Sequence, residues 1–171
     1  MAKKTLISWA EYRSPLGSVL VSSDIKGISG VGLPAKKSDF LSGIRKAGGE
    51  PVESPASFTT LFMIFDEYFR GKAVEFNVPL SLKGSSFDLA VWKALQKIPW
   101  GSALSYGEVA ASIGRPQAAR AVGGACGRNP VPIIIPCHRV LASNALVGGF
   151  SGGINIKKAL LGLEGIAFIE P

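Results

Sequence analysis

Two serine-x-x-acid patterns in the second half of the chain constrain the fold most, because each fixes the residue at which a helix begins. Ser85 and Asp88 form the first pattern, and the helix that it opens must end at Pro99, since proline cannot continue a helix. Ser105 and Glu108 form the second pattern and open a shorter helix. The second half of the chain is therefore predicted to be mainly helical.

A turn follows the second of these helices and leads into a third. Gly114-Arg115-Pro116 is the turn, and Gln117–Cys126 is predicted to be helical. Two short helices joined by a glycine-containing turn are typical of the helix-turn-helix motif. Beyond them, Asn129–Pro132 favours extended backbone, and the apolar Ile133–Ile135 is predicted to be a buried strand.

The first half of the chain has a different character, with short strands and fewer helices. Strands are predicted at Ser18–Ser22 and Ile28–Leu33, a helix from Ser38 that Gly48-Gly49 ends, and a second helix that Ser57 caps and Gly71 ends. Lys83-Gly84-Ser85 is typical of a linker. The chain is therefore predicted to be α+β, with an α+β domain at residues 1–82 and a mainly helical domain at residues 86–171.

Composition excludes several classes of protein. With 171 residues, 47% of them apolar, the chain can bury a core and is not intrinsically disordered. No apolar run is long enough to span a bilayer, and no targeting leader is evident, so we expect a cytoplasmic protein. Two cysteines and one histidine leave little scope for a disulfide framework or a zinc site, and we expect no metal and no cofactor.

Charge is unevenly distributed along the chain. No acidic residue occurs from Val109 to Leu163. The basic residues of that stretch are Arg115, Arg120, Arg128, Arg139, Lys157 and Lys158. Such a stretch favours a polyanionic partner, most simply nucleic acid, although a solvated basic surface without a partner is an equally simple interpretation.

The third predicted helix carries few side chains that could read DNA bases. Only Gln117 and Arg120 are long and polar, and the other residues are small. Small residues allow close approach of a backbone to the minor groove, where sequence information is poor. They also allow tight packing against a neighbouring helix. We favour the first interpretation, which predicts DNA binding with little sequence preference.

Cys137 is the candidate nucleophile. A cysteine after an apolar run is more often a small buried side chain, but His138 stands next to it. In extended backbone the two side chains point to opposite faces, so a proton would pass between them through one water molecule. Glu164, in the last turn of the final helix, is either an exposed surface residue or the group that orients His138. A Glu–His–water–Cys relay would generate a thiolate.

The motif Pro136-Cys137-His138-Arg139-Val140 resembles the hallmark of the O6-alkylguanine-DNA alkyltransferases. The resemblance covers residues 86–165 and is looser in the first half, through Ser14-Pro15-Leu16-Gly17 and the aromatic pattern ending at Gly71. Other matching segments are Phe87 to Gly101, Ser105-Tyr106, Arg120-Ala121-Val122-Gly123, Asn129-Pro130, Ser151-Gly152-Gly153 and Leu160-Leu161 with Glu164-Gly165. The family's fold implies a ribonuclease-H-like first domain, built of a small antiparallel sheet with helices, and a mainly helical DNA-binding second domain with a helix-turn-helix.

The resemblance implies repair of DNA by a single irreversible transfer of the alkyl group from O6-alkylguanine, and also from O4-alkylthymine, to a cysteine. It implies that Cys137 accepts the alkyl group, that His138 and Glu164 relay its proton, that Asn129 holds the bend before the nucleophile, and that Tyr106 assists the departing base. Implied substrate contacts are Val140, Ser151, Phe150, Gly148, Gly152 and Pro132. Implied DNA contacts are Tyr106, Gln117, Ala118, Ala119, Arg120, Ala121, Gly123 and Arg128, with Arg120 entering the stack of the flipped base.

The implied partner is double-stranded DNA containing O6-alkylguanine, bound by a monomer whose cooperativity on DNA is left open; in a prokaryote the protein would lie with the nucleoid. Three alternatives remain at this point. They are a lesion-binding protein that does not react, a transcriptional regulator, and a cysteine hydrolase. Cys137 argues against the first, the small residues of the third helix against the second, and the adjacency of Cys137 and His138 against the third.

Overall fold

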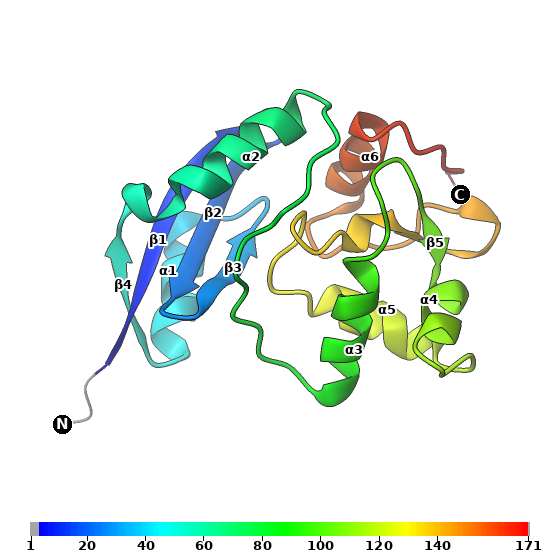
Figure 1. The fold of residues 1–171 in the computed structure, drawn as a ribbon, viewed down its shortest axis with the longest axis horizontal. Coiled ribbons are helices and arrows are strands. Elements are labelled where there is room, and N and C mark those ends of the chain that lie inside the picture. The colour runs from blue at the N-terminus through cyan, green and yellow to red at the C-terminus, as the bar shows by residue number, and fades with distance from the viewer. Residues whose placement is uncertain (1–3, 171) are drawn as a thin grey trace. The chain divides into compact units, whose positions relative to one another are not determined.

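The computed structural model describes residues 4–170, and the chain divides after Leu82 into two compact units (Figure 1). The first unit is built on a four-stranded sheet of order β3-β2-β1-β4. Strands β1 (Thr5–Ser14), β2 (Gly17–Asp24) and β3 (Gly27–Gly32) are antiparallel neighbours. Strand β4 (Gly49–Glu53) runs parallel to β1, so the sheet is mixed rather than wholly antiparallel. The parallel pair arises because the helix α1 (Lys37–Lys46) crosses between β3 and β4.

Helix α2 (Thr59–Phe69) lies across one face of the sheet (Figure 1). Tyr12 of β1 contacts the rings of Phe62, Phe65 and Phe69, with centroid distances of 5.2, 5.2 and 5.9 Å. The aromatic stripe of α2 is therefore core, as helical spacing predicts. The prediction that Ser57 caps this helix is wrong, because the short 3-10 turn η1 (Pro55–Phe58) precedes it.

The second unit is mainly helical. Its helices are α3 (Ser86–Leu95), α4 (Tyr106–Ser112), α5 (Ala119–Gly127) and α6 (Ile154–Leu163), joined by the 3-10 turns η2 (Cys137–Arg139) and η3 (Ser143–Ala145). The two-residue strands β5 (Leu104–Ser105) and β6 (Val140–Leu141) pair in parallel. Both predicted capping boxes are present, at the starts of α3 and α4.

Helices α4 and α5 form the predicted helix-turn-helix, and α3 supports it. The indole Nε1 of Trp92 on α3 donates a hydrogen bond of 2.9 Å to the carbonyl oxygen of Ala125 on α5. Helix α5 begins at Ala119, so Gln117 lies in the preceding turn rather than in the helix. None of the helices within residues 4–170 combines the length and the apolar character that crossing a membrane requires.

Candidate active site

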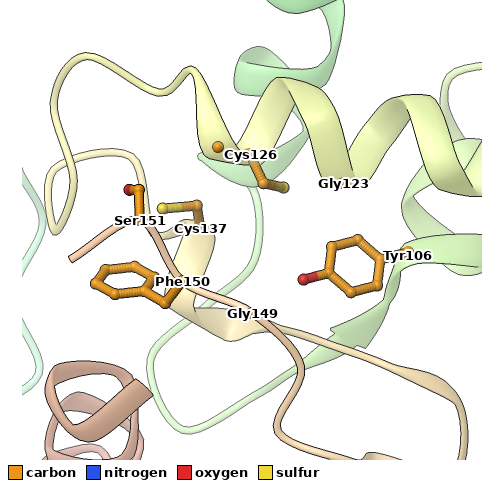
Figure 2. Close-up of a pocket in the computed structure, with 8 residues that line it drawn as sticks. Tyr106, Gly123, Cys126, Cys137, Gly149, Phe150 and Ser151 are labelled. Atoms are coloured by element: carbon orange, nitrogen blue, oxygen red, sulfur yellow. The ribbon is translucent and has the colours of Figure 1, made fainter. Parts of the chain in front are cut away.

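Cys137 begins the 3-10 turn η2 and lies at a small cavity (Figure 2). The side chain is buried, with 4% of its surface exposed. The cavity has a volume of about 240 Å³. Its lining comes from the helix-turn-helix, from η2 and from the loop before α6, and consists of Tyr106, Gly123, Cys126, Gly127, Cys137, Gly149, Phe150 and Ser151.

The segment before Cys137 is a turn and not the predicted strand. Ile133 has a φ of 73°, a left-handed conformation that β-branched residues rarely adopt. Asn129 holds this turn from inside, because its Nδ2 donates to the carbonyl of Ile135 at 2.8 Å and its Oδ1 accepts from the amide of Val131 at 3.0 Å. The turn and its buried amide fix the position of Cys137 at the cavity.

His138 is fully buried behind Cys137 and contacts Glu164. The distance from His138 Nε2 to Glu164 Oε1 is 2.7 Å. Glu164 is only 4% exposed, so the alternative of a surface glutamate is wrong. The extended backbone expected at Cys137 and His138 is also wrong, because both residues lie in η2.

Arg139 completes the group around Glu164, a role that the sequence analysis missed. Its Nε donates to Glu164 Oε2 at 2.7 Å and its Nη2 donates to Oε1 at 3.0 Å, while Nη1 donates to the carbonyl of Ile98. Burial alone would raise the pKa of Glu164, but the hydrogen bonds from His138 and Arg139 outweigh it and lower the pKa to about 2. Glu164 is therefore a carboxylate at neutral pH.

The protonation state of His138 follows from these contacts. Burial lowers the pKa of the imidazole, and the contact with Glu164 opposes that effect only in part. A neutral ring that faces a carboxylate through Nε2 must carry its proton there and donate it. Nδ1 is then the basic nitrogen of His138.

The other titratable groups of the cavity are held neutral in the free protein. Burial raises the pKa of the Cys137 thiol, and a hydrogen bond from Asn129 and the charge of Lys157 oppose the effect. Burial and the neighbouring cysteines raise the pKa of Tyr106 to about 12, and burial raises that of Cys126 to about 12. Figure 2 shows the Tyr106 hydroxyl directed into the cavity on the side of Cys137. A phenol in this state can donate a hydrogen bond.

Lys157 is the second residue that the sequence analysis missed. Its side chain is 0% exposed, and its Nζ donates to the carbonyl of Val140 at 2.6 Å and to that of Gly149 at 3.2 Å. The ammonium also lies 5.9 Å from the centroid of the Tyr106 ring. Arg139 is buried as well, so two of the six basic residues between Val109 and Leu163 cannot contact a partner. The basic surface of this stretch is therefore smaller than the count of charges in the sequence predicts.

Apart from Tyr106 on α4 and Arg128 directly after α5, the predicted DNA contacts lie along α5 and the turn before it. Gln117, Arg120 and Ala121 are exposed, whereas Ala118, Ala119 and Gly123 are partly buried. Gly123 faces Tyr106, because a Cβ at this position would lie 3.8 Å from the Tyr106 ring. Arg128 is exposed but its Nη2 lies 2.7 Å from Oδ1 of Asp88, so part of its charge is balanced within the protein.

The predicted substrate contacts divide into two groups. Ser151 and Phe150 line the cavity. Pro132, Val140, Gly148 and Gly152 are not among the lining residues, and both Pro132 and Val140 are buried. Gly148 has a φ of 65°, and a Cβ there would lie 3.3 Å from the Tyr106 hydroxyl oxygen.

Within residues 4–170, no three His, Cys, Asp or Glu side chains come together in a way that could hold a metal ion. The side chains that line the cavity include the Cys137 thiol and the Tyr106 phenol, and the His138–Glu164 pair adjoins Cys137.

The second unit combines a helix-turn-helix with a buried cysteine that lies next to an imidazole–carboxylate pair. This combination is typical of a DNA-binding protein with a reactive thiol. Residues 86–166 match the model of the 6-O-methylguanine DNA methyltransferase DNA-binding domain, and residues 7–82 match that of the ribonuclease-like domain of the same proteins. The chain belongs to the 6-O-methylguanine DNA methyltransferase family.

Known proteins of this family resemble the chain over nearly its whole length. It is 39% identical over 159 residues to a methylated-DNA–protein-cysteine methyltransferase of Methanosarcina acetivorans, covering 92% of this chain and 97% of that protein. It is 38% identical over 167 residues to that of Haemophilus influenzae, covering 97% and 90%. The crystal structure of Mycobacterium tuberculosis OGT in complex with DNA superposes with a TM-score of 0.82 at 38% identity, covering 92% of each chain.

Proposed function

We propose that this chain repairs DNA by transferring the alkyl group of O6-alkylguanine in a duplex to the Sγ of Cys137. The observation that carries the proposal is the buried Cys137 thiol at a cavity, with the His138–Glu164 pair directly behind it. The names of the related proteins and the DNA-bound mycobacterial relative support the same reaction and the same partner.

The reaction begins with the thiol proton. The neutral His138 receives it at Nδ1 through one water molecule, and the carboxylate of Glu164 stabilises the imidazolium that forms. The thiolate attacks the alkyl carbon, so that a carbon–sulfur bond forms as the carbon–O6 bond breaks. The proton ends on the repaired guanine, which stays bonded to its deoxyribose, and no cofactor is consumed.

Tyr106 acts on the departing base. A neutral phenol aimed into the cavity donates a hydrogen bond to N3 of guanine, where negative charge develops as O6 loses its alkyl group. The backbone carbonyl of Cys137 is proposed to accept from the exocyclic amine, and the Ser151 amide to donate to O6. The carbonyl of Val140 is the second proposed acceptor for the amine, and it already accepts from Lys157 at 2.6 Å. Phe150 lines the same cavity and offers its ring to the base.

The lesion must leave the base stack to reach Cys137. We propose that the base is flipped out through the minor groove, with the small residues of α5 against the backbone and the exposed Arg120 in the gap. A mismatched O6-alkylguanine pairs weakly and flips at lower cost than a normal base. O4-alkylthymine presents an alkyl group in an equivalent chemical setting and is the second proposed substrate.

Each molecule acts once, because the thioether on Cys137 is stable and no group in the cavity removes it. The protein is proposed to act as a monomer, with double-stranded DNA as its partner. The cell compartment proposed for it is the cytoplasm.

The test is the intact mass of the protein after incubation with a duplex that carries one O6-methylguanine. A gain of a single methyl group that saturates at one per protein, maps to Cys137 and disappears in Cys137→Ala would support the proposal. Tight binding to the lesion without a mass change would instead identify a protein that recognises damage and does not react.

A further inference from the structure

The side chain of Lys157 joins two segments at the cavity, the one that carries Cys137 and the loop before α6. Val140, whose carbonyl accepts at 2.6 Å, directly follows the turn that carries Cys137. Gly149, whose carbonyl accepts at 3.2 Å, belongs to the cavity-lining loop with Phe150 and Ser151. One ammonium group therefore holds the loop against the nucleophile turn.

The charge of Lys157 has no carboxylate to balance it. Within the described residues 4–170, no Asp or Glu lies within ion-pair distance of its Nζ. The buried carboxylate of Glu164 is already paired with Arg139, at 2.7 Å. The buried groups around Cys137 thus carry one excess positive charge while the thiol is protonated. Burying an uncompensated ammonium is costly, which makes an anion beside it favourable.

We propose that Lys157 is a positioning residue for the alkyl transfer: it fixes the Gly149–Ser151 segment over Cys137, and its charge stabilises the Cys137 thiolate. The inference rests on the proposed function, since the thiolate is the attacking species there. Both contacts of Lys157 are to backbone carbonyls, so the residue acts through the segments it holds and through its charge, without touching the reacting atoms.

A pH profile distinguishes this role from a purely structural one. Burial lowers the pKa of Lys157 to about 8, and the thiols of Cys137 and Cys126 oppose that effect. Tyr106 and His138 also face this region, but the pKa of Tyr106 is raised to about 12 and that of His138 is lowered. The ammonium is present below about pH 8 and lost above it. Transfer by the wild-type protein should therefore decline as the pH rises beyond this value, although thiol ionisation alone would accelerate it.

The decisive experiment compares Lys157→Met with Lys158→Met. Methionine is an unbranched side chain only one heavy atom shorter than lysine, and it has neither the charge nor the donors. Lys158 is the matched control, because it is the next residue on α6 and pairs with Glu170 at 2.9 Å, away from the cavity lining. The rate of methyl transfer is measured in single turnover at saturating O6-methylguanine duplex, together with the dissociation constant for that duplex.

We expect Lys157→Met to transfer at least about tenfold more slowly at neutral pH, which is the effect of raising the thiol pKa by about one. Its dissociation constant should change by less than about twofold, since Lys157 is buried and takes no part in binding the duplex backbone. Its rate should no longer decline at high pH. Lys158→Met should retain both the wild-type rate and the wild-type profile. Equal rates and equal pH profiles for Lys157→Met and the wild type would overturn the proposal.

A DNA-independent measurement separates this inference from the proposed function. Iodoacetamide reacts with the thiolate form of cysteine, and trypsin places Cys126 in the peptide 121–128 and Cys137 in the peptide 129–139. Slower labelling of Cys137 in Lys157→Met than in Lys158→Met would support the charge effect even if the wild-type protein transferred no methyl group. If Lys157→Met does not fold, the high-pH decline of the wild-type rate remains the test, and a rate that rises through this range would refute the role.

Discussion

Replacing Glu164 by glutamine tests the electrostatics at the centre of the second unit. The variant keeps the shape of the side chain and removes its charge, so that the guanidinium of Arg139 stays buried without a carboxylate. Breaking a buried pair from one side generally costs about 3–5 kcal/mol.

The pKa of Glu164 gives a second, independent value for the free energy of unfolding that is lost when the charge of Glu164 is removed. A carboxyl whose pKa falls from 4.5 to about 2 on folding contributes about 3 kcal/mol to stability at neutral pH. Because the pKa is lower in the folded state, this contribution is complete above pH 4.5 and disappears as the pH falls towards 2. For a chain of this size, a loss of about 3 kcal/mol corresponds to a decrease in Tm of about 6–12 °C.

Thermal or urea unfolding of Glu164→Gln and the wild type across the acid range measures this contribution. We expect the difference in unfolding free energy to be about 3 kcal/mol at neutral pH and to shrink towards zero as the pH approaches 2. Glu170→Gln is the control, because its ion pair with Lys158 is exposed and should be worth less than about 1 kcal/mol. A difference for Glu164→Gln that stays constant over the whole acid range would refute the electrostatic explanation and indicate a packing defect.

Three further outcomes are expected. Tyr106→Phe should fold normally but transfer methyl about 100-fold more slowly in single turnover, because the departing guanine loses its donor; an unchanged rate would exclude that role. Gly148→Ala should lower the unfolding free energy by about 1–2 kcal/mol, since alanine is strained at a φ of 65° and its Cβ would lie 3.3 Å from the Tyr106 hydroxyl; urea unfolding at wild-type concentrations would contradict this. Methylation of Cys137 should destabilise the protein by about 1–3 kcal/mol through overpacking beside the Asn129-held turn, and equal melting temperatures of the two forms would argue against it.

Local sequence patterns predicted the elements whose ends are fixed by neighbouring residues. Both capping boxes specify a helix start through contacts three residues apart, and both helices begin where the pattern places them. Strand β4 has no such local signal. Its short sequence becomes a strand because the edge of β1 is available to it, a contact between segments far apart in the chain.

The predicted strand at Ile133–Ile135 was wrong for a related reason. Its composition favours β structure, but the side chain of Asn129 supplies the hydrogen bonds that hold a turn there, with Ile133 in the left-handed region. Tertiary contacts outweighed local propensity at a position that fixes where Cys137 lies.

The candidate site shows what counting charges along a sequence misses. Arg139 and Lys157 contribute to a basic stretch in the sequence, yet both are buried in the structure. The partner of Arg139 lies 25 residues away in the chain, and the partners of Lys157 are backbone carbonyls. Neither arrangement leaves a signal in spacing or composition, whereas the adjacent Cys137 and His138 do.

The burial of Cys137 affects how long an unused molecule could stay active in a cell. A thiol that is 4% exposed and has a raised pKa reacts poorly with oxidants and with small electrophiles in solution. If one lesion inactivates one polypeptide of 171 residues, then each side reaction of Cys137 with an electrophilic metabolite would also inactivate one polypeptide, which the cell would have to synthesise again. If the proposed reaction holds, storage in an unreactive state would keep the population of molecules intact, and the number of lesions that the cell can correct at once would equal the number of copies it holds.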